Sequence, residues 1–189
     1  MHQPKVVAFS RMQDGSRADY ALVDEFQRAY ERGLPNRLLA APSRLDEGES
    51  WQGFKESRLT HSLQTATRAE NDGADVDTIV GAVLHDIGDE LAPRNHSQLA
   101  ASILRPYVRP EVTWVVEHHG LFQMQYYAEH LGLDPHGHLA YRDHKWFQSC
   151  QGFCERWDQT SFDPDYATQP LRHFEGMLRE VFGRKAFGA

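Results

Sequence analysis

Hydrophobic residues recur at helical rather than alternating spacing along almost the whole chain. The pattern predicts a first helix over residues 19–39, with Leu22, Phe26 and Tyr30 on one face. The polar, glycine-containing segment 42–53 indicates a loop. Further helices are predicted over residues 58–70, 75–86, 96–104, 110–119, 139–158 and 170–182. No segment alternates convincingly as a strand would, so the expected fold class is all-α, a helical bundle.

The length of 189 residues and the hydrophobic content of 40% fit a single domain over residues 1–189 with its own core. No apolar run approaches the roughly 20 residues that a membrane span requires. Residues 1–14 also lack the apolar core of a signal peptide. We therefore expect a cytoplasmic protein that does not contact a membrane.

The net charge of -7, without any face rich in lysine and arginine, argues against a nucleic acid as partner. It leaves an anionic small molecule open, because a metal ion or a local arginine cluster can reverse the charge inside a pocket. Cys150 and Cys154 are four residues apart on a predicted helix. Reduced core thiols explain them most simply, with a disulfide or a metal role as the alternative. The oligomeric state does not follow from these features.

The pair His85-Asp86 stands at the end of the apolar run 79–84. An imidazole beside a carboxylate behind a buried segment suits metal binding better than packing. The neutral imidazole offers one nitrogen, and the carboxylate is able to bridge two ions, a combination typical of iron, manganese or zinc. These two residues are the main candidates for direct participation in catalysis.

Other potential ligands follow in an ordered series: His61, His96, the doublet His118-His119, and Asp158. The 24 residues between His61 and His85 suit two antiparallel helices joined by a turn. Burying several unpaired ionisable groups would cost several kcal/mol each, whereas a metal site satisfies them together. Consecutive helical residues point about 100° apart, so one member of the doublet faces the metal, and we favour His119 over His118.

The order His61, His85-Asp86 and Asp158 resembles the HD-domain superfamily of metal-dependent hydrolases and oxygenases, over roughly residues 58–158. Residues 84–88, Leu-His-Asp-Ile-Gly, are similar to its signature. His96 and His119 resemble the additional ligands of its mixed-valent diiron oxygenase branch. The resemblance implies an HD-type bundle around two iron ions, Fe(II) and Fe(III), with O2 as co-substrate. The first iron would be held by His61, His85, Asp86 and Asp158, and the second by Asp86, His96 and His119.

Within that branch, the chain is most similar to phosphonate-degrading members. This implies cleavage of the C–P bond of a small organophosphonate of the 1-hydroxy-2-(trimethylammonio)ethylphosphonate type, giving glycine betaine and phosphate. The alternative is a metal-dependent phosphohydrolase that cleaves a phosphoester. The helix and the polar loop over residues 19–57 are expected to form a lid over the site.

The substrate-binding candidates come partly from departures from the branch members that take a primary ammonium. Asp89 and Gln123 stand where those enzymes carry a histidine and a lysine, and Trp51 and Phe54 stand in their amine-binding stretch. Aromatic faces satisfy a quaternary ammonium, although a core or lid position is the ordinary explanation for any one of them. Two further candidates are Tyr30, as a ligand carried by the lid, and Arg142, among the basic residues that would hold the phosphonate.

Overall fold

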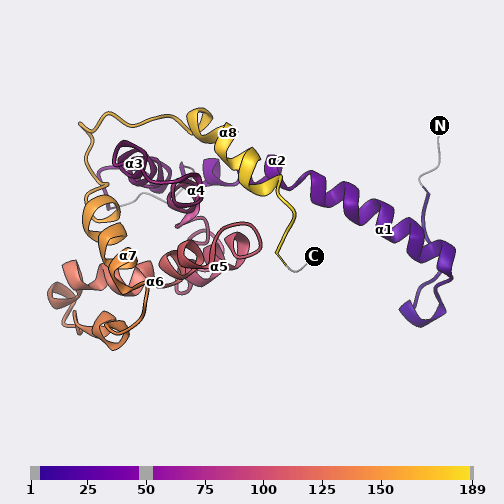
Figure 1. Cartoon of the computed structure of the whole chain (residues 1–189), viewed down its shortest axis with the longest axis horizontal. Coiled ribbons are helices and arrows are strands. Elements are labelled where there is room, and N and C mark those ends of the chain that lie inside the picture. The colour runs from indigo at the N-terminus through magenta and orange to yellow at the C-terminus, as the bar shows by residue number, and fades with distance from the viewer. Residues whose placement is uncertain (1–4, 47–52, 188–189) are drawn as a thin grey trace.

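The computed structural model describes residues 5–46 and 53–187 of the chain (Figure 1). Within these residues the chain forms helices and turns and no strand, which confirms the predicted all-α class. No helix of the described part is both long enough and apolar enough to cross a membrane.

The regular helices are α1 (Arg17–Arg32), α2 (Leu34–Ala40), α3 (Arg58–Asn71), α4 (Val76–Leu84), α5 (His96–Leu104), α6 (Pro110–Tyr127), α7 (Phe147–Phe153) and α8 (Leu171–Phe182). Short 3-10 turns lie at Met12–Asp14, Pro42–Asp46, Ala128–Leu131 and Gly137–Tyr141, and a π-helical turn, Cys154–Asp158, follows α7. In the bundle, α3 packs against α4 and the π-helical turn, α6 against α5 and α7, and α8 against α2 and α4.

The core lies between these helices and is largely aliphatic. The apolar run of α4, residues 79–84, is entirely buried, and α6 contributes Val116 and Phe122. Gly81 sits where α4 meets α6, and a Cβ there would lie 2.7 Å from Val112 Cγ1. Cys150 and Cys154 are buried free thiols in the same core. The tight contact between α4 and α6 fixes the backbone from which the His-Asp pair emerges.

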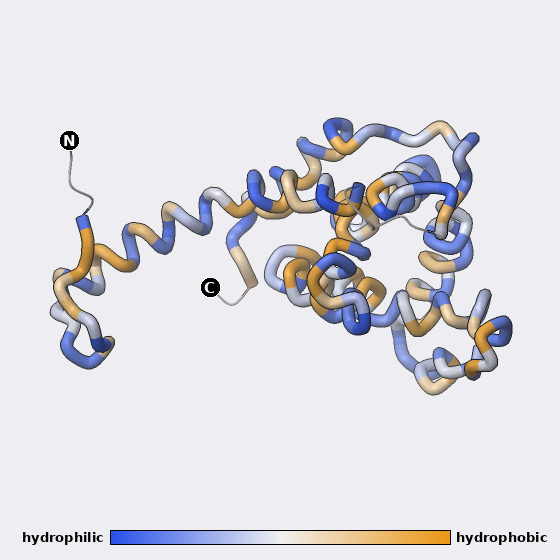
Figure 2. The backbone as a smooth tube through the Cα atoms, turned by 180° about the vertical axis from the view of Figure 1, so that it is seen from behind, coloured by the Kyte–Doolittle hydropathy of each residue, from blue (hydrophilic) through white to orange (hydrophobic). Residues whose placement is uncertain are grey.

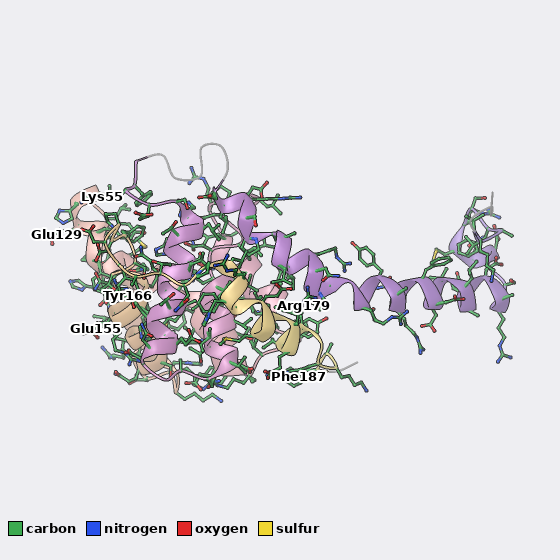
Figure 3. All side chains as sticks on the ribbon, turned by 90° about the horizontal axis from the view of Figure 1, so that it is seen from above. Lys55, Glu129, Glu155, Tyr166, Arg179 and Phe187 are labelled. Atoms are coloured by element: carbon green, nitrogen blue, oxygen red, sulfur yellow. The ribbon has the colours of Figure 1, made fainter. Side chains whose placement is uncertain are left out.

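The predicted helix over residues 19–39 is broken into two. Gly33 separates α1 from α2, and Pro35 in the first turn of α2 cannot continue the hydrogen-bond ladder of α1. Whereas α2 packs on α8, α1 extends away from the bundle (Figures 1 and 3). Helix α1 covers none of the described bundle, and the lid over residues 19–57 stays a prediction.

The predicted helix over residues 139–158 is also interrupted. A 3-10 turn ends at Tyr141, and α7 begins at Phe147. Between them the His144 ring stacks on Trp114 of α6, with centroids 4.2 Å apart, and this tertiary contact holds the turn. The helix then widens into the π-helical turn, a distortion frequent at functional sites. Asp158 is therefore presented by a distorted turn rather than by a regular helix.

The start of α4 is fixed by Asp75, whose side chain accepts a hydrogen bond from the Thr78 amide at 3.0 Å. The same carboxylate pairs with the Arg109 guanidinium. Burial raises the pKa of Asp75, but Arg109 and Thr78 outweigh it, so that the pKa lies below its ordinary value. A lowered folded-state pKa stabilises the fold above the ordinary carboxyl pKa, and this contribution is lost as the pH falls through the folded-state value.

We therefore expect Asp75→Ala to lower the free energy of unfolding by about 1 kcal/mol at pH 7, through loss of the helix cap. Asp75→Asn keeps a capping oxygen and loses the partly exposed ion pair, so its cost should be smaller. Urea denaturation at pH 7, 5 and about 3 measures both variants. The difference between wild type and Asp75→Asn should stay constant from pH 7 to 5 and shrink below about pH 4, and a difference that stayed constant down to about pH 3 would contradict the assignment.

Candidate metal centre

The structure brings the six predicted ligand residues together from five segments. They are His61 of α3, His85 and Asp86 directly after α4, His96 at the start of α5, His119 of α6 and Asp158 of the π-helical turn. All are buried except His96, whose side chain is 23% exposed. The bundle thus encloses a cluster of four imidazoles and two carboxylates in its interior.

The first donor group comprises His61, His85, Asp158 and one oxygen of Asp86. His61 Nε2 lies 3.1 Å from His85 Nε2, 3.1 Å from Asp158 Oδ1 and 3.4 Å from Asp86 Oδ2. His85 Nε2 lies 3.4 Å from Asp86 Oδ2 and 3.6 Å from Asp158 Oδ1. Ligand bonds of about 2.0–2.2 Å place neighbouring donors of one ion about 3.0–3.6 Å apart. The spacing of this group is that of ligands around a single ion.

The second donor group uses the other oxygen of Asp86. His119 Nε2 lies 3.3 Å from Asp86 Oδ1, and His96 Nε2 lies 3.5 Å from the same atom. The rings of His96 and His119 face this oxygen with their centroids 5.2 Å apart. Asp86 therefore directs Oδ2 to one donor group and Oδ1 to the other, as a carboxylate between two ions does.

The histidines are oriented by hydrogen bonds on the opposite side of each ring. Nδ1 of His61, His85 and His119 lies 2.9, 2.7 and 2.7 Å from the carbonyl oxygens of Ser161, Ala82 and Val116, respectively. A carbonyl oxygen accepts but cannot donate, so each Nδ1 carries the hydrogen and each Nε2 presents a lone pair. The backbone thereby directs the metal-binding nitrogens inward.

A metal ion fits this arrangement. The Nε2 lone pairs of His61 and His85 face each other across 3.1 Å and also face carboxylate oxygens, and such atoms repel without a cation between them. Asp158 Oδ2 is a buried oxygen with no hydrogen-bond partner among the described residues. Imidazole nitrogens with carboxylate oxygens are a donor set suited to iron, manganese or zinc.

The electrostatics of the cluster also favour a cation. Burial raises the pKa of Asp158, but His85 and His61 outweigh it and hold the pKa below its usual range. Burial likewise opposes ionisation of Asp86, whose pKa lies well below the ordinary value because of His85, His119 and His61. Burial lowers the pKa of His61, yet Asp158 and Asp86 raise it above normal. Both carboxylates therefore stay charged in the protein interior.

His118 and His119 point in different directions, as expected for consecutive residues of a helix. His119 points into the cluster, while His118 donates from Nδ1 to the Trp114 carbonyl at 2.8 Å and stacks on the Trp114 ring. Trp114 has His144 on its other face, so His118 belongs to an aromatic stack. This geometry favours His119 over His118 as a ligand.

Asp89 lies directly behind His96, one of the predicted ligands. Its Oδ1 lies 3.1 Å from His96 Nδ1, and its Oδ2 pairs with Arg58 Nη1 at 2.5 Å. A carboxylate behind a metal-binding imidazole fixes the ring and raises its basicity. The sequence identified Asp89 as a departure from related enzymes, but its partners, His96 and Arg58, could not be read from the spacing.

Phe162 is a contact that sequence reasoning missed. Its ring stacks on His61 with centroids 4.3 Å apart, and Phe54 stacks on the outer face of Phe162 at 5.2 Å. Phe54 is 49% exposed and is separated from the cluster by Phe162. The feature of the sequence that could have identified Phe162 is its position, four residues after Asp158. The pair covers the first donor group from outside.

The remaining substrate-binding candidates are dispersed. Gln123 is half-buried and lies one turn after His119 on α6. Tyr30 is 63% exposed on the projecting α1, beneath the Arg37 guanidinium, so this arrangement does not place it at the metal cluster. The Arg142 side chain is 73% exposed and its partner is Asp143, which argues against its role as a phosphonate ligand. Trp51 lies outside the described residues.

Comparison with known proteins identifies the domain that carries five of these six residues, all but Asp158. Residues 58–150 match the model of the HD domain family, within the core predicted over residues 58–158. The chain contains an HD domain. HD domains bind divalent metals, and this one brings together histidine and aspartate groups that are able to hold them.

One characterised relative of this HD protein is the [1-hydroxy-2-(trimethylamino)ethyl]phosphonate dioxygenase (glycine-betaine-forming) of Leisingera caerulea. The two are 33% identical over 82 residues, which cover 38% of this chain. The match spans 42% of the length of the relative, less than half of that enzyme.

The second donor group depends on a close approach of the backbone at Gly88. A Cβ at this position would lie 2.5 Å from the His96 carbonyl oxygen and 2.8 Å from its Cα. These atoms belong to the backbone and cannot rotate away. We expect Gly88→Ala to displace His96 and to reduce the bound metal from two ions per chain to one, as measured by elemental analysis after anaerobic loading.

The matched control is Gly176→Ala on α8, where an added Cβ meets nothing within 4 Å. It should bind two ions like the wild type. If Gly88→Ala also retained two ions, His96 would not be a ligand of the second one.

Proposed function

We propose that this HD-domain chain is a dinuclear iron oxygenase that uses O2 to cleave the C–P bond of a 1-hydroxyalkylphosphonate carrying a quaternary ammonium. The products would be a carboxylate, glycine betaine in the simplest case, and phosphate. The observation that carries the proposal is the position of Asp86, with its two oxygens in two separate donor groups. The dioxygenase of Leisingera caerulea supports the oxygenase assignment.

The residues present indicate how two ions would be shared. His61, His85, Asp86 and Asp158 would hold one, and Asp86, His96 and His119 the other. When bound, iron would supply the redox chemistry with O2 that amino-acid side chains lack. The four imidazoles would keep their Nε2 lone pairs available, because backbone carbonyl oxygens accept the Nδ1 hydrogens. For His96 that carbonyl belongs to Pro93, at 3.3 Å, and Asp89 Oδ1 lies beside the same nitrogen at 3.1 Å.

A cavity of about 510 Å³ adjoins the second donor group at His96. Its wall includes Arg94, His96, His118, Met124, Tyr127 and Tyr141. His96 is the most exposed of the six ligand residues and connects the cluster with this cavity. The volume is ample for a small organophosphonate. We place the substrate here.

Arg94 is the basic residue best placed to hold the phosphonate. It lines the cavity and forms no ion pair with another described residue, whereas Arg58 is paired with Asp89. A guanidinium matches the geometry of phosphonate oxygens. The rings of Tyr127 and Tyr141 in the same wall offer aromatic faces to a quaternary ammonium. The cavity thus presents complementary groups to both ends of such a zwitterion.

We expect Arg94→Ala to raise KM for the phosphonate about 10- to 100-fold, as loss of a hydrogen bond to a charged group does. The matched control is Arg142→Ala, an exposed arginine paired with Asp143, which should leave KM within about twofold. Steady-state phosphate release measures both variants. An unchanged KM in Arg94→Ala would remove Arg94 from the substrate site.

The reaction itself is tested with anaerobically iron-loaded protein and 1-hydroxy-2-(trimethylammonio)ethylphosphonate. Phosphate and glycine betaine should appear in equal amounts after O2 is admitted and not before. Asp86→Asn should abolish turnover, since it weakens both donor groups at once. The same ions could instead activate water for phosphoester hydrolysis. Release of phosphate from a phosphoester without O2, and none from the phosphonate, would overturn the oxygenase proposal in favour of a phosphohydrolase.

A further inference from the structure

Helix α1 has sixteen residues, and none of them is buried. Hydrophobic and hydrophilic residues alternate along it in short runs (Figure 2), and its side chains point into open space on every side (Figure 3). Val23, Phe26 and Tyr30 are 40%, 53% and 63% exposed. At helical spacing these three residues share one face. Apart from the Arg37 guanidinium over the Tyr30 ring, the apolar face of α1 has no partner among the described residues.

An isolated helix of this length is marginal in water, because most helices in proteins are stabilised by packing of an amphipathic face. The ends of α1 are well fixed. Ser16 and Asp19 form a reciprocal capping box, and Tyr20 stacks on Phe9 with centroids 5.4 Å apart. The middle of the helix is supported by the exposed Asp24–Arg28 ion pair at 2.9 Å and by a hydrogen bond from Gln27 Nε2 to Glu31 Oε1 at 3.1 Å, and exposed pairs of this kind stabilise a helix only weakly. Its apolar face requires a partner.

The junction with α2 holds α1 away from the bundle. Arg37 Nη1 donates to the Tyr30 carbonyl at 2.9 Å, and its guanidinium lies 3.8 Å from the centre of the Tyr30 ring. On the other side, Asn36 Oδ1 accepts from Arg179 Nη1 of α8 at 2.7 Å, and Leu38 is buried. These contacts fix the direction of α1 and argue against its folding back onto its own bundle.

The charges of α1 identify the partner. The first nine residues, 17–25, carry three carboxylates and one arginine, while the last seven, 26–32, carry two arginines and one glutamate. A second copy of this helix in the antiparallel direction would set the acidic half of each against the basic half of the other. A parallel copy would place the two acidic halves together and the two basic halves together, so that like charges would repel. Self-complementarity of this kind is what a two-fold symmetric interface requires.

We propose that α1 is a dimerisation helix, with the face of Val23, Phe26 and Tyr30 packed antiparallel against the same face of a second copy. The apolar residues would be withdrawn from water, and the opposed charges would set the direction of pairing. The pairing is independent of the proposed reaction, because the six metal-ligand candidates of each chain lie in its own bundle.

Sedimentation velocity over a range of concentrations tests the interface. Wild type should sediment as a dimer and Phe26→Glu as a monomer with unchanged metal content. The matched control is Leu131→Glu, which changes a 64% exposed apolar residue in the 3-10 turn Ala128–Leu131 that follows α6, and this variant should remain dimeric. A monomeric wild type, or a dimer that Phe26→Glu leaves intact, would overturn the proposal.

Charge reversal tests whether the two copies meet through α1. Asp24→Arg with Glu25→Arg makes both halves basic, and Arg28→Glu with Arg32→Glu makes both halves acidic. Each double variant should be monomeric alone, and an equimolar mixture should form a heterodimer. Circular dichroism checks that helix content is retained. Failure of the mixture to associate while both variants remain helical would refute charge pairing along α1.

Spin labels at residue 17 then report the direction. With a rise of about 1.5 Å per residue, antiparallel helices place two such labels roughly 20 Å or more apart. Labels in close contact would indicate parallel pairing and contradict the proposed symmetry.

Discussion

The Asp86 carboxylate lies between four imidazoles, and the bundle must hold it so that each of its oxygens faces two of them. Oδ2 approaches His61 and His85, and Oδ1 approaches His96 and His119, all at 3.3–3.5 Å. A single side chain can serve two ions only if its backbone is held firmly. The buried α4, its contact with α6 at Gly81 and the close approach of Gly88 to His96 supply that rigidity. Each histidine is in turn directed by a hydrogen bond behind its ring.

Much of the fold followed from periodicity, since helices that pack on one face carry that face in their sequence. The predicted segments 58–70, 96–104 and 170–182 lie within one residue of α3, α5 and α8. The sequence predicted one continuous helix over 19–39 and another over 139–158, and both predictions were wrong because each segment is interrupted in the structure. The first breaks at Gly33 and Pro35, and the second at the stack of His144 on Trp114, a contact between residues distant in sequence.

The candidate site, like the fold, could be predicted only in part. Chemistry and order along the chain singled out six residues that the structure gathers, because buried ionisable groups demand partners. Their supporting contacts could not be predicted in this way. Phe162 lies a hundred residues from His61, and the role of Asp89 depends on the fold of the turn that carries it. Arg142 and Tyr30 were plausible by residue type, but the fold leaves both exposed.

The central claim is that one carboxylate joins two ions. The most direct measurement is Mössbauer spectroscopy of anaerobically iron-loaded protein, before and after partial oxidation by O2. Bridging by Asp86 predicts two irons per chain that become a spin-coupled Fe(II)/Fe(III) pair. Asp86→Asn should lose that coupling. A single iron per chain, or two irons without magnetic coupling, would contradict the account.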